Sequence, residues 1–170
     1  MNKLINNEKD DIRKPNFKLN SNSNSSSNIP RITSKELDIK IISKSFDESG
    51  DSGATVIFVG IVRNYSENGR VQGMNYESYV GMAEERIKKI ENSVQKMWNI
   101  KKINIVHRIG DLNVGDPSIV IAISTPHSKD AFEACQYILE KIKHDVPIWK
   151  KEKIMNGKTK WVIGKSIKSD

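Results

Sequence analysis

Cysteine is almost absent from this chain of 170 residues, in which Cys135 is the single example. One thiol excludes an internal disulfide and any zinc site built from several thiolates. We expect neither a metal ion nor another cofactor. Cys135 falls on the same helical stripe as Phe132, Leu139 and Ile142. We therefore predict that it is a buried apolar residue and not a nucleophile.

Long hydrophobic runs are also missing. The longest, ATVIFVGIV at 54–62, is far shorter than the ~20 residues that cross a bilayer. The N-terminal stretch MNKLINNEKDD lacks the apolar core of a signal peptide, and it contains the acidic residues that transit peptides avoid. We expect the protein to act in the cytosol.

Apolar clusters are scarce in residues 1–33, which include the run NSNSNSSSN. Such a segment cannot bury enough surface to offset the entropy of ordering. We predict a disordered Asn/Ser-rich tail over residues 1–33. Residues 34–170 are predicted to form one folded domain, because their number suits a single hydrophobic core.

Beyond the tail, the hydrophobic pattern alternates between strand and helix periods. Strands are predicted at 37–43, 54–62, 74–80, 103–110, 118–125, 147–154 and 158–163, with a loop at 111–117. Helices are predicted at 82–98 and 128–144, the second with Ser128 as its N-cap. The Asn-Gly pair at 156–157 is typical of a hairpin turn. Without regular β-α-β repetition, this order predicts an α+β fold with a mainly antiparallel sheet and a C-terminal β-hairpin.

Positive charge is concentrated near the C-terminal end. The formal net charge is +7, and residues 141–168 contain nine lysines against two carboxylates. Lys143 lies in the last turn of a predicted helix, where the helix dipole favours a cation. Lys150 lies beyond the proline that follows, so the chain can fold back and bring the two ammonium groups together. Trp149 then points to the other side of the strand and should anchor it in the core. A solvated lysine face is the alternative.

Several ordered segments resemble one family. They are GATVIFVGIVRN, YESYVGMAEERI, VHRIGDLNVGD, TPHSKDAFEACQYILEKIK and PIWKKE followed by WV. Together they span about residues 37–163 and are similar to the MoaE family, the large catalytic subunits of molybdopterin synthase. The resemblance implies an α/β-hammerhead-like fold and a homodimer of large subunits. Each large subunit would bind a small ubiquitin-like MoaD subunit, which makes a heterotetramer with no role for nucleic acid or membrane.

The same resemblance implies a reaction. The family converts cyclic pyranopterin monophosphate, precursor Z, to molybdopterin by inserting two sulfurs as a dithiolene, in molybdenum cofactor biosynthesis. The sulfur arrives as a thiocarboxylate on the C-terminal glycine of the small subunit. The chemistry of this chain agrees, because its one thiol is predicted to be buried and the sulfur must then come from a partner. Convergent lysines would attract both anionic reactants, and their mutual repulsion would leave one amine neutral for proton transfer or covalent attack.

The resemblance also implies roles for single residues. Lys143 and Lys150 fall on lysines that the family uses in catalysis. The implied substrate-binding residues are Arg63, His127, Ser128, Lys129, Lys143, Lys150, Lys151 and Glu152. The family has an arginine where Ser128 stands. Either Lys129 supplies that charge from one residue along, or the anion site is weaker, because adjacent helical residues point about 100° apart. We assign no chemistry to His107 and Arg108, which read as sheet residues.

Two other functions stay open at the level of sequence. A basic nucleic-acid-binding module is suggested by lysines interleaved with Trp149 and Trp161, and tight binding at physiological salt would reveal it. Against it, both tryptophans lie in segments that alternate like half-buried strands. A catalytically inactive scaffold that keeps the subunit interfaces is suggested by Ser128. An assay for molybdopterin separates the scaffold from the enzyme.

Overall fold

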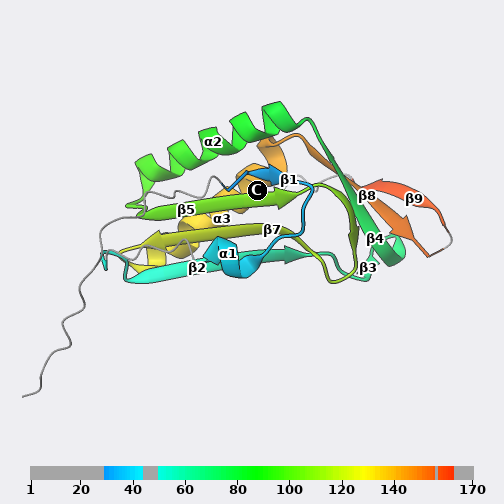
Figure 1. Ribbon diagram of the computed structural model, residues 1–170, viewed down its shortest axis with the longest axis horizontal. Coiled ribbons are helices and arrows are strands. Elements are labelled where there is room, and N and C mark those ends of the chain that lie inside the picture. The colour runs from blue at the N-terminus through cyan, green and yellow to red at the C-terminus, as the bar shows by residue number, and fades with distance from the viewer. Residues whose placement is uncertain (1–28, 44–49, 156, 163–170) are drawn as a thin grey trace, which may run out of the picture.

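The computed structural model describes residues 29–43, 50–155 and 157–162. Long strands and two helices make up most of the molecule, and a smaller sheet projects at one end (Figure 1). The elements are β1 Ile32–Thr33, α1 Ile39–Ser43, β2 Ala54–Ile61, β3 Tyr65–Ser66, β4 Gly69–Ser78, α2 Val80–Met97, β5 Lys102–Arg108, β6 Gly110–Asn113, β7 Pro117–Thr125, α3 Ser128–Asp145, β8 Ile148–Ile154 and β9 Thr159–Val162.

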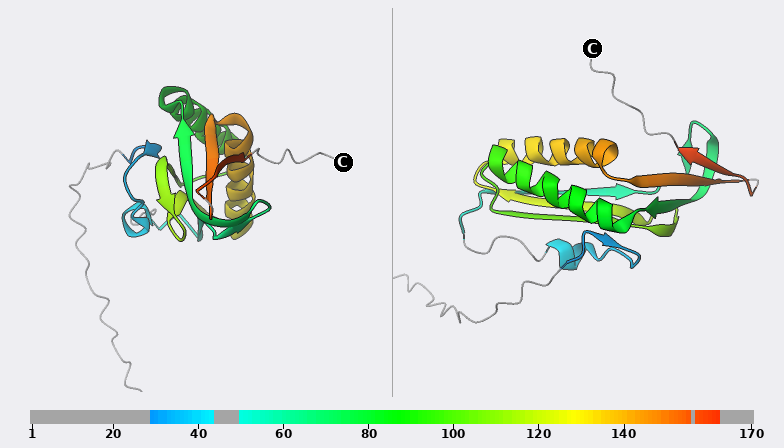
Figure 2. Two further views of the ribbon diagram at one scale, coloured as in Figure 1. Left: turned by 90° about the vertical axis from the view of Figure 1, so that its right-hand side faces the viewer. Right: turned by 90° about the horizontal axis from the view of Figure 1, so that it is seen from above.

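The larger sheet has the strand order β1-β5-β7-β2 and is antiparallel except where β1 joins β5. Helices α2 and α3 cover one face and α1 lies on the other (Figure 2). Strand β7 is apolar on both sides, since Ile121 and Ile123 pack with the two long helices and Val120 and Ala122 pack with α1. The main core therefore lies between this sheet and helices α2 and α3.

Helix α3 shows how the apolar spacing positions the core. Residues Ala134, Cys135, Ile138 and Ile142 are buried in the main cluster. The prediction that Cys135 is buried is confirmed, and burial raises the pKa of its thiol above the usual value. Phe132, which was placed on the same stripe, is exposed.

The smaller sheet has the order β3-β4-β8-β9, and β6 also pairs with β4. At the bulge in β4, Gly73 lies so close to β6 that a Cβ would come within 2.8 Å of the Leu112 carbonyl oxygen. Only glycine fits there without moving the backbone. Beneath this sheet, Val62, Tyr76 and Leu112 form a separate small core.

The expected α+β class, with a mainly antiparallel sheet, two main helices and a C-terminal hairpin, is confirmed. Three local predictions are wrong. Residues 37–43 include helix α1 instead of a strand, and the loop predicted at 111–117 contains the end of β6. His127, and not Ser128, is the N-cap of α3, without a side-chain cap hydrogen bond.

The boundary between tail and domain also differs from the prediction. Strand β1 lies within the segment assigned to the tail, Ile32 is buried, and Arg31 donates to a Glu91 carboxylate oxygen from Nε at 3.0 Å and from Nη2 at 2.6 Å. Ordered structure therefore begins before Ser34. Residues 1–28 of the predicted tail, residues 44–49, the first residue of the Asn-Gly turn and residues 163–170 lie outside the described residues. None of the helices in the described ranges is long and apolar enough to cross a membrane.

Candidate active site

Lys150 is the centre of the candidate site. It lies on β8 opposite Tyr76 of β4, whose side chain is buried in the small core. Burial lowers the pKa of Lys150 below its ordinary 10.5, and the charges of Lys143 and Arg63 lower it further. Because the charged form is disfavoured, more of this amine is neutral than in an exposed lysine.

The three cations come from three different elements. Lys143 is in the last turn of α3, where the helix dipole favours positive charge, and Arg63 follows the end of β2. The Arg63 guanidinium lies over the ring of Tyr65, 5.0 Å from its centroid. The charges of Lys143 and Arg63 thus both act on Lys150, although Lys143 and Arg63 are themselves exposed. Their roles in catalysis and substrate binding stay predictions.

Lys151 and Glu152, which were predicted to bind substrate, have other contacts in the structure. Glu152 is 4% exposed, and its Oε2 accepts hydrogen bonds from Ser66 Oγ at 2.8 Å and Asn68 Nδ2 at 2.9 Å. The Lys151 ammonium lies 5.1 Å from the centre of the Trp161 ring, on the opposite face of β8 from Lys150. Glu152 thus ties the turn between β3 and β4 to β8, and Lys151 belongs to the outer face.

The prediction that Trp149 anchors its strand in the core is wrong. Trp149 is 52% exposed and Trp161 is 49% exposed. Polar Lys150 and Glu152 occupy the inward face of β8 instead, and the apolar indoles lie outside. The burial of both tryptophans, which was expected to argue against nucleic-acid binding, is therefore not observed.

His127, Ser128 and Lys129 lie at the other end of α3 from Lys143. With a rise of 1.5 Å per residue, the helix separates Lys129 from Lys143 by about 21 Å. The Lys129 side chain is 82% exposed and pairs with Glu133 at 3.8 Å. Within one chain the structure does not bring these three residues to the lysine site.

A residue that sequence reasoning passed over packs against Tyr76, the register partner of Lys150. His107 of β5 is 5% exposed, and its ring packs edge-on against Tyr76 with the centroids 5.2 Å apart. Burial lowers the pKa of His107 to about 4, and the charge of Lys150 contributes. The sequence did contain a signal for His107, because an ionisable residue stands there at the end of the otherwise apolar strand INIVH.

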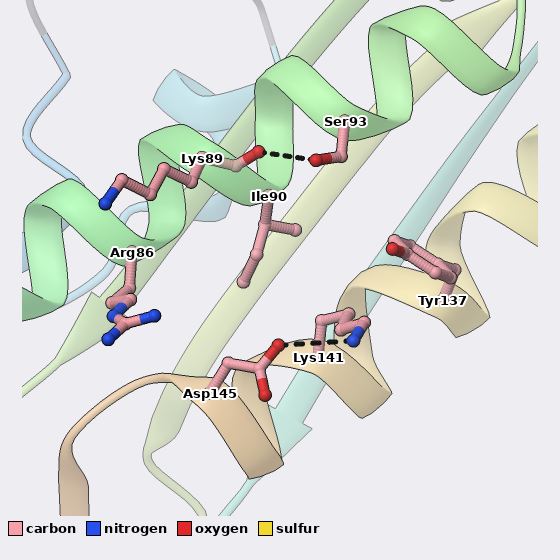
Figure 3. A pocket seen from close by; sticks show the side chains of 7 residues that line it. All are labelled: Arg86, Lys89, Ile90, Ser93, Tyr137, Lys141 and Asp145. Carbon is pink, nitrogen blue, oxygen red and sulfur yellow. Dashed lines mark hydrogen bonds and ion pairs between the residues drawn. The ribbon is translucent and has the colours of Figure 1, made fainter.

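A depression lies between the two long helices (Figure 3). It has a volume of about 140 Å³ and is lined by Arg86, Lys89, Ile90, Ser93, Tyr137, Lys141 and Asp145. Lys141 is held by Asp145 at 3.3 Å, and Ser93 donates to the Lys89 carbonyl oxygen at 2.9 Å. None of the lysine-site residues lines it. Among the residues that the structure describes, no group of three or more His, Cys, Asp or Glu is placed to hold a metal ion.

Residues 32–145 match the family described as "MoaE protein". The chain belongs to the MoaE family. The matched range includes Arg63 and Lys143 and ends before Lys150. The family expected from the sequence motifs is thereby confirmed.

Individual MoaE relatives agree. The molybdopterin synthase catalytic subunit of Staphylococcus carnosus (strain TM300) is 39% identical over 119 residues, which are 70% of this chain and 79% of the relative. The crystal structure of molybdopterin synthase from Staphylococcus aureus superposes with a TM-score of 0.72 at 36% identity, over 78% of this chain and 96% of that one. This similarity confirms the expected fold class.

A further solved structure is described as a protein–protein complex of subunits 1 and 2 of molybdopterin-converting factor from Helicobacter pylori 26695. It superposes with a TM-score of 0.63 at 26% identity and covers 81% of this chain and 90% of that one. A MoaE-like fold therefore occurs in that organism within a complex of two different subunits.

Proposed function

We propose that this chain is the catalytic subunit of molybdopterin synthase, a sulfurtransferase of molybdenum cofactor biosynthesis. It converts cyclic pyranopterin monophosphate to molybdopterin, and the two sulfurs come from the C-terminal thiocarboxylate of a small MoaD-like subunit. The support is membership of the MoaE family together with relatives named for this activity. We place the reaction in the cytosol.

The observation that carries the proposal is that the charges of Lys143 and Arg63 both act on Lys150, which is itself partly buried. Arg63 and Lys143 are charged groups that bind the cyclic phosphate and the incoming thiocarboxylate. They also stabilise the negative charge that builds on the phosphate as its ring opens. The lowered pKa of Lys150 makes its amine the group that accepts a proton or attacks an acyl carbon.

The proposed assembly is a heterotetramer of two large and two small subunits. The complex from Helicobacter pylori supports the small partner. The length of α3 supports the large-subunit dimer, because His127, Ser128 and Lys129 lie too far from Lys143 to reach the lysine site of their own chain. In the dimer, this end of one large subunit contributes to the lysine site of the other.

The direct test mixes the purified chain with a thiocarboxylated small subunit and cyclic pyranopterin monophosphate, and measures molybdopterin. Lys143→Ala and Lys150→Ala should each reduce product formation by a factor of about 100 or more. Lys153→Ala is the matched control, since Lys153 lies on the outer face of β8 and pairs with Asp111 at 2.9 Å. That variant should retain normal turnover.

Two outcomes would contradict the proposal. Near-normal turnover in both lysine variants would remove the site. Binding of the small subunit without any product from the unaltered chain would favour the inactive scaffold that Ser128 suggested. Binding of oligonucleotides that stays tight at physiological salt would instead favour a nucleic-acid-binding module, because a merely basic surface loses such binding steeply as salt rises.

A further inference from the structure

The residue before Arg63 is held by a turn from a distant part of the sequence. Val62 donates from its backbone N–H to the Asp116 carbonyl oxygen at 3.0 Å, and its own carbonyl oxygen accepts from the Gly115 N–H at 2.8 Å. Its side chain is 3% exposed and belongs to the small core. The turn at 113–116, between β6 and β7, therefore fixes the backbone from which Arg63 emerges.

The backbone is fixed on the other side of Arg63 as well. The Asn64 carbonyl oxygen accepts from the Val71 N–H of β4 at 3.0 Å. The Arg63 side chain itself is exposed, and its guanidinium lies 5.0 Å from the centre of the Tyr65 ring. Because an exposed arginine has much rotamer freedom, the backbone on its two sides sets where the guanidinium can reach.

The Asp116 side chain holds the turn at 113–116 in shape. Its Oδ2 accepts from the Asn113 backbone N–H at 2.9 Å and from Arg108 Nη1 at 3.3 Å. The Asp116 N–H also donates to the Asn113 carbonyl oxygen at 3.1 Å. Gly115 has a φ of 94°, in the left-handed region that favours glycine. One carboxylate oxygen thus closes the turn and connects it to Arg108.

Arg108 belongs to the larger sheet. It is the last residue of β5 and the register partner of Thr33 in β1. Its side chain is 11% exposed, and its Nε is buried without a hydrogen-bond partner among the residues that the structure describes. A guanidinium that is this buried needs an anionic partner, which Asp116 provides. The segment VHRIGDLNVGD, which contains both residues, therefore links the larger sheet to the turn.

We propose that Arg108 and Asp116 are positioning residues for Arg63. Their ion pair holds the turn at 113–116, the turn holds Val62, and Val62 fixes the start of the segment that carries the guanidinium. Neither residue needs to touch the substrate for this role. The binding of the substrate phosphate by Arg63 rests on the function proposed above, whereas the order of these contacts does not.

Four substitutions separate positioning from general stabilisation. Arg108→Met removes the donor and keeps an unbranched side chain, and Arg108→Lys keeps a cation for Asp116. Asp116→Ala removes the carboxylate from the turn. Asp111→Ala is the matched control, because this carboxylate of the neighbouring strand β6 pairs with Lys153 instead. Positioning predicts that Arg108→Lys restores what Arg108→Met loses.

The first measurement is the NMR chemical shift of the Arg63 side-chain protons in the full chain, which requires no pterin. While the guanidinium lies over Tyr65, the ring shifts these protons upfield. We expect most of this upfield shift to disappear in Arg108→Met and Asp116→Ala and to remain in Arg108→Lys and Asp111→Ala. A general loss of stability does not change the shift in the folded protein. Unaltered Arg63 shifts in Arg108→Met and Asp116→Ala would therefore overturn the proposal.

The second measurement is the affinity for cyclic pyranopterin monophosphate, by calorimetry. Arg108→Met and Asp116→Ala should each raise Kd about tenfold, the scale of one lost charge-assisted hydrogen bond. In an Arg63→Ala background, the same substitutions should change Kd by less than about twofold, since no guanidinium is left to position. Equal losses in the two backgrounds would show that Arg108 and Asp116 do not act through Arg63, which contradicts the proposal.

A further variant guards against misfolding of the single substitutions, each of which leaves one charge without its partner. Arg108→Met combined with Asp116→Ala removes both charges, and it is judged by the same two measurements. If the Arg63 shifts change as expected in a chain that does not bind the pterin, the positioning role stands and the proposed function fails. If the pterin binds and the Arg63 shifts stay unaltered, the positioning role fails and the proposed function stands.

Discussion

Lys150 and His107 are ionisable side chains that burial pushes toward their neutral forms. For the lysine this increases the neutral fraction of the amine, and for the histidine it keeps the ring neutral near pH 7. Holding these groups in their neutral forms lowers the free energy of unfolding. A group whose pKa is lower in the folded protein than in the unfolded chain makes folding less favourable as soon as the unfolded chain binds the proton.

The lowered pKa of His107 predicts how the stability of the protein changes in acid. Its pKa is about 4 in the folded protein, whereas a histidine in the unfolded chain has the ordinary value of 6.5. Between these values the unfolded chain binds more protons, so the free energy of unfolding must fall as pH decreases from about 6.5 toward 4. The full contribution is about 3 kcal/mol, from ~1.4 kcal/mol per pKa unit. Urea unfolding across this range measures it.

His107→Gln is the control, because its side chain does not titrate while the carboxylates of the protein stay the same. The unaltered chain should lose more stability than the variant between pH 6.5 and 4. Parallel stability curves would show that His107 is not buried in its neutral form.

At the residue scale the sequence separated Lys150 from Trp149 on β8 but did not indicate which side of the strand would face inward. Strand alternation separates Lys150 from Trp149 without saying which of them is buried. Hydrophobicity favours the tryptophan, but in the structure Trp149 is exposed, while Lys150 is partly buried and Glu152 on the same side is buried. His107 was passed over because the sequence shows only its own strand. Its position at the end of an apolar strand indicates burial, but it does not indicate that Tyr76 of the other sheet packs against it.

At the scale of elements, strand β8 makes polar contacts on both faces of the smaller sheet. On its inner side Glu152 holds Ser66 and Asn68 through the same carboxylate oxygen. On its outer side Lys153 pairs with Asp111, which also accepts from Asn75 Nδ2 at 2.7 Å. The strand is therefore fixed on both faces by polar contacts, which cross to β3 and the β3–β4 turn on the inner face and to β6 on the outer face.

Glu152 provides a test of this arrangement. Glu152→Ala leaves two donors without their acceptor and should lower the free energy of unfolding by about 2 kcal/mol or more. Glu152→Gln keeps one amide oxygen at the position that receives both hydrogen bonds, so its cost should be clearly smaller. Chemical denaturation of the two variants measures the difference. Equal losses would mean that the negative charge, and not the acceptor, is what this site requires.

The N-terminal element offers a second test. Deletion of residues 1–33 removes β1, the buried Ile32 and the contact of Arg31 with Glu91, and should cost about 2 kcal/mol and lower Tm by about 5 °C. Deletion of residues 1–28 keeps these contacts and is expected to leave Tm and turnover almost unchanged, since that segment is poor in apolar residues. Equal Tm values for the two deletions would contradict a stabilising role for β1.

Long periodic segments explain why most elements could be predicted, and short ones explain the errors. Helices α2 and α3 have 18 residues each, enough for an apolar stripe to repeat several times. Helix α1 has five residues, and an apolar run of that length fits either a strand or a helix. Strand β6 was missed because it has four residues, of which Leu112 is the buried one.

At the scale of the whole molecule, helix α3 separates two groups of predicted site residues. His127, Ser128 and Lys129 lie at its start, and Lys143 lies at its end near Lys150 in the chain. The dimer proposal makes a prediction about mixtures. Large subunits carrying Lys150→Ala and His127→Ala, dissociated and re-associated at equal amounts, should regain about one quarter of normal activity, because half of the dimers are mixed and each has one complete site. Each variant alone should remain nearly inactive. Molybdopterin formation per subunit is the measurement.

A site built within one chain would give no recovery in that mixture. Lys143→Ala mixed with Lys150→Ala is the matched control, since these residues belong to the same site in each subunit. That pair should stay inactive after re-association, because every mixed dimer then has one defect in each site.

The outer face of the terminal hairpin has an optical consequence. Trp149 and Trp161 are half exposed there with the Lys151 ammonium against one ring, whereas Trp98 packs on Tyr137 near the far end of α2. Indole emission responds to water and to nearby charge. A protein that covers the hairpin will shift the fluorescence of two of the three tryptophans, while the emission of Trp98 supplies a constant background. The chain therefore carries its own unlabelled reporter, which distinguishes a partner on the outside of β8 from a ligand at Lys150 on the inside.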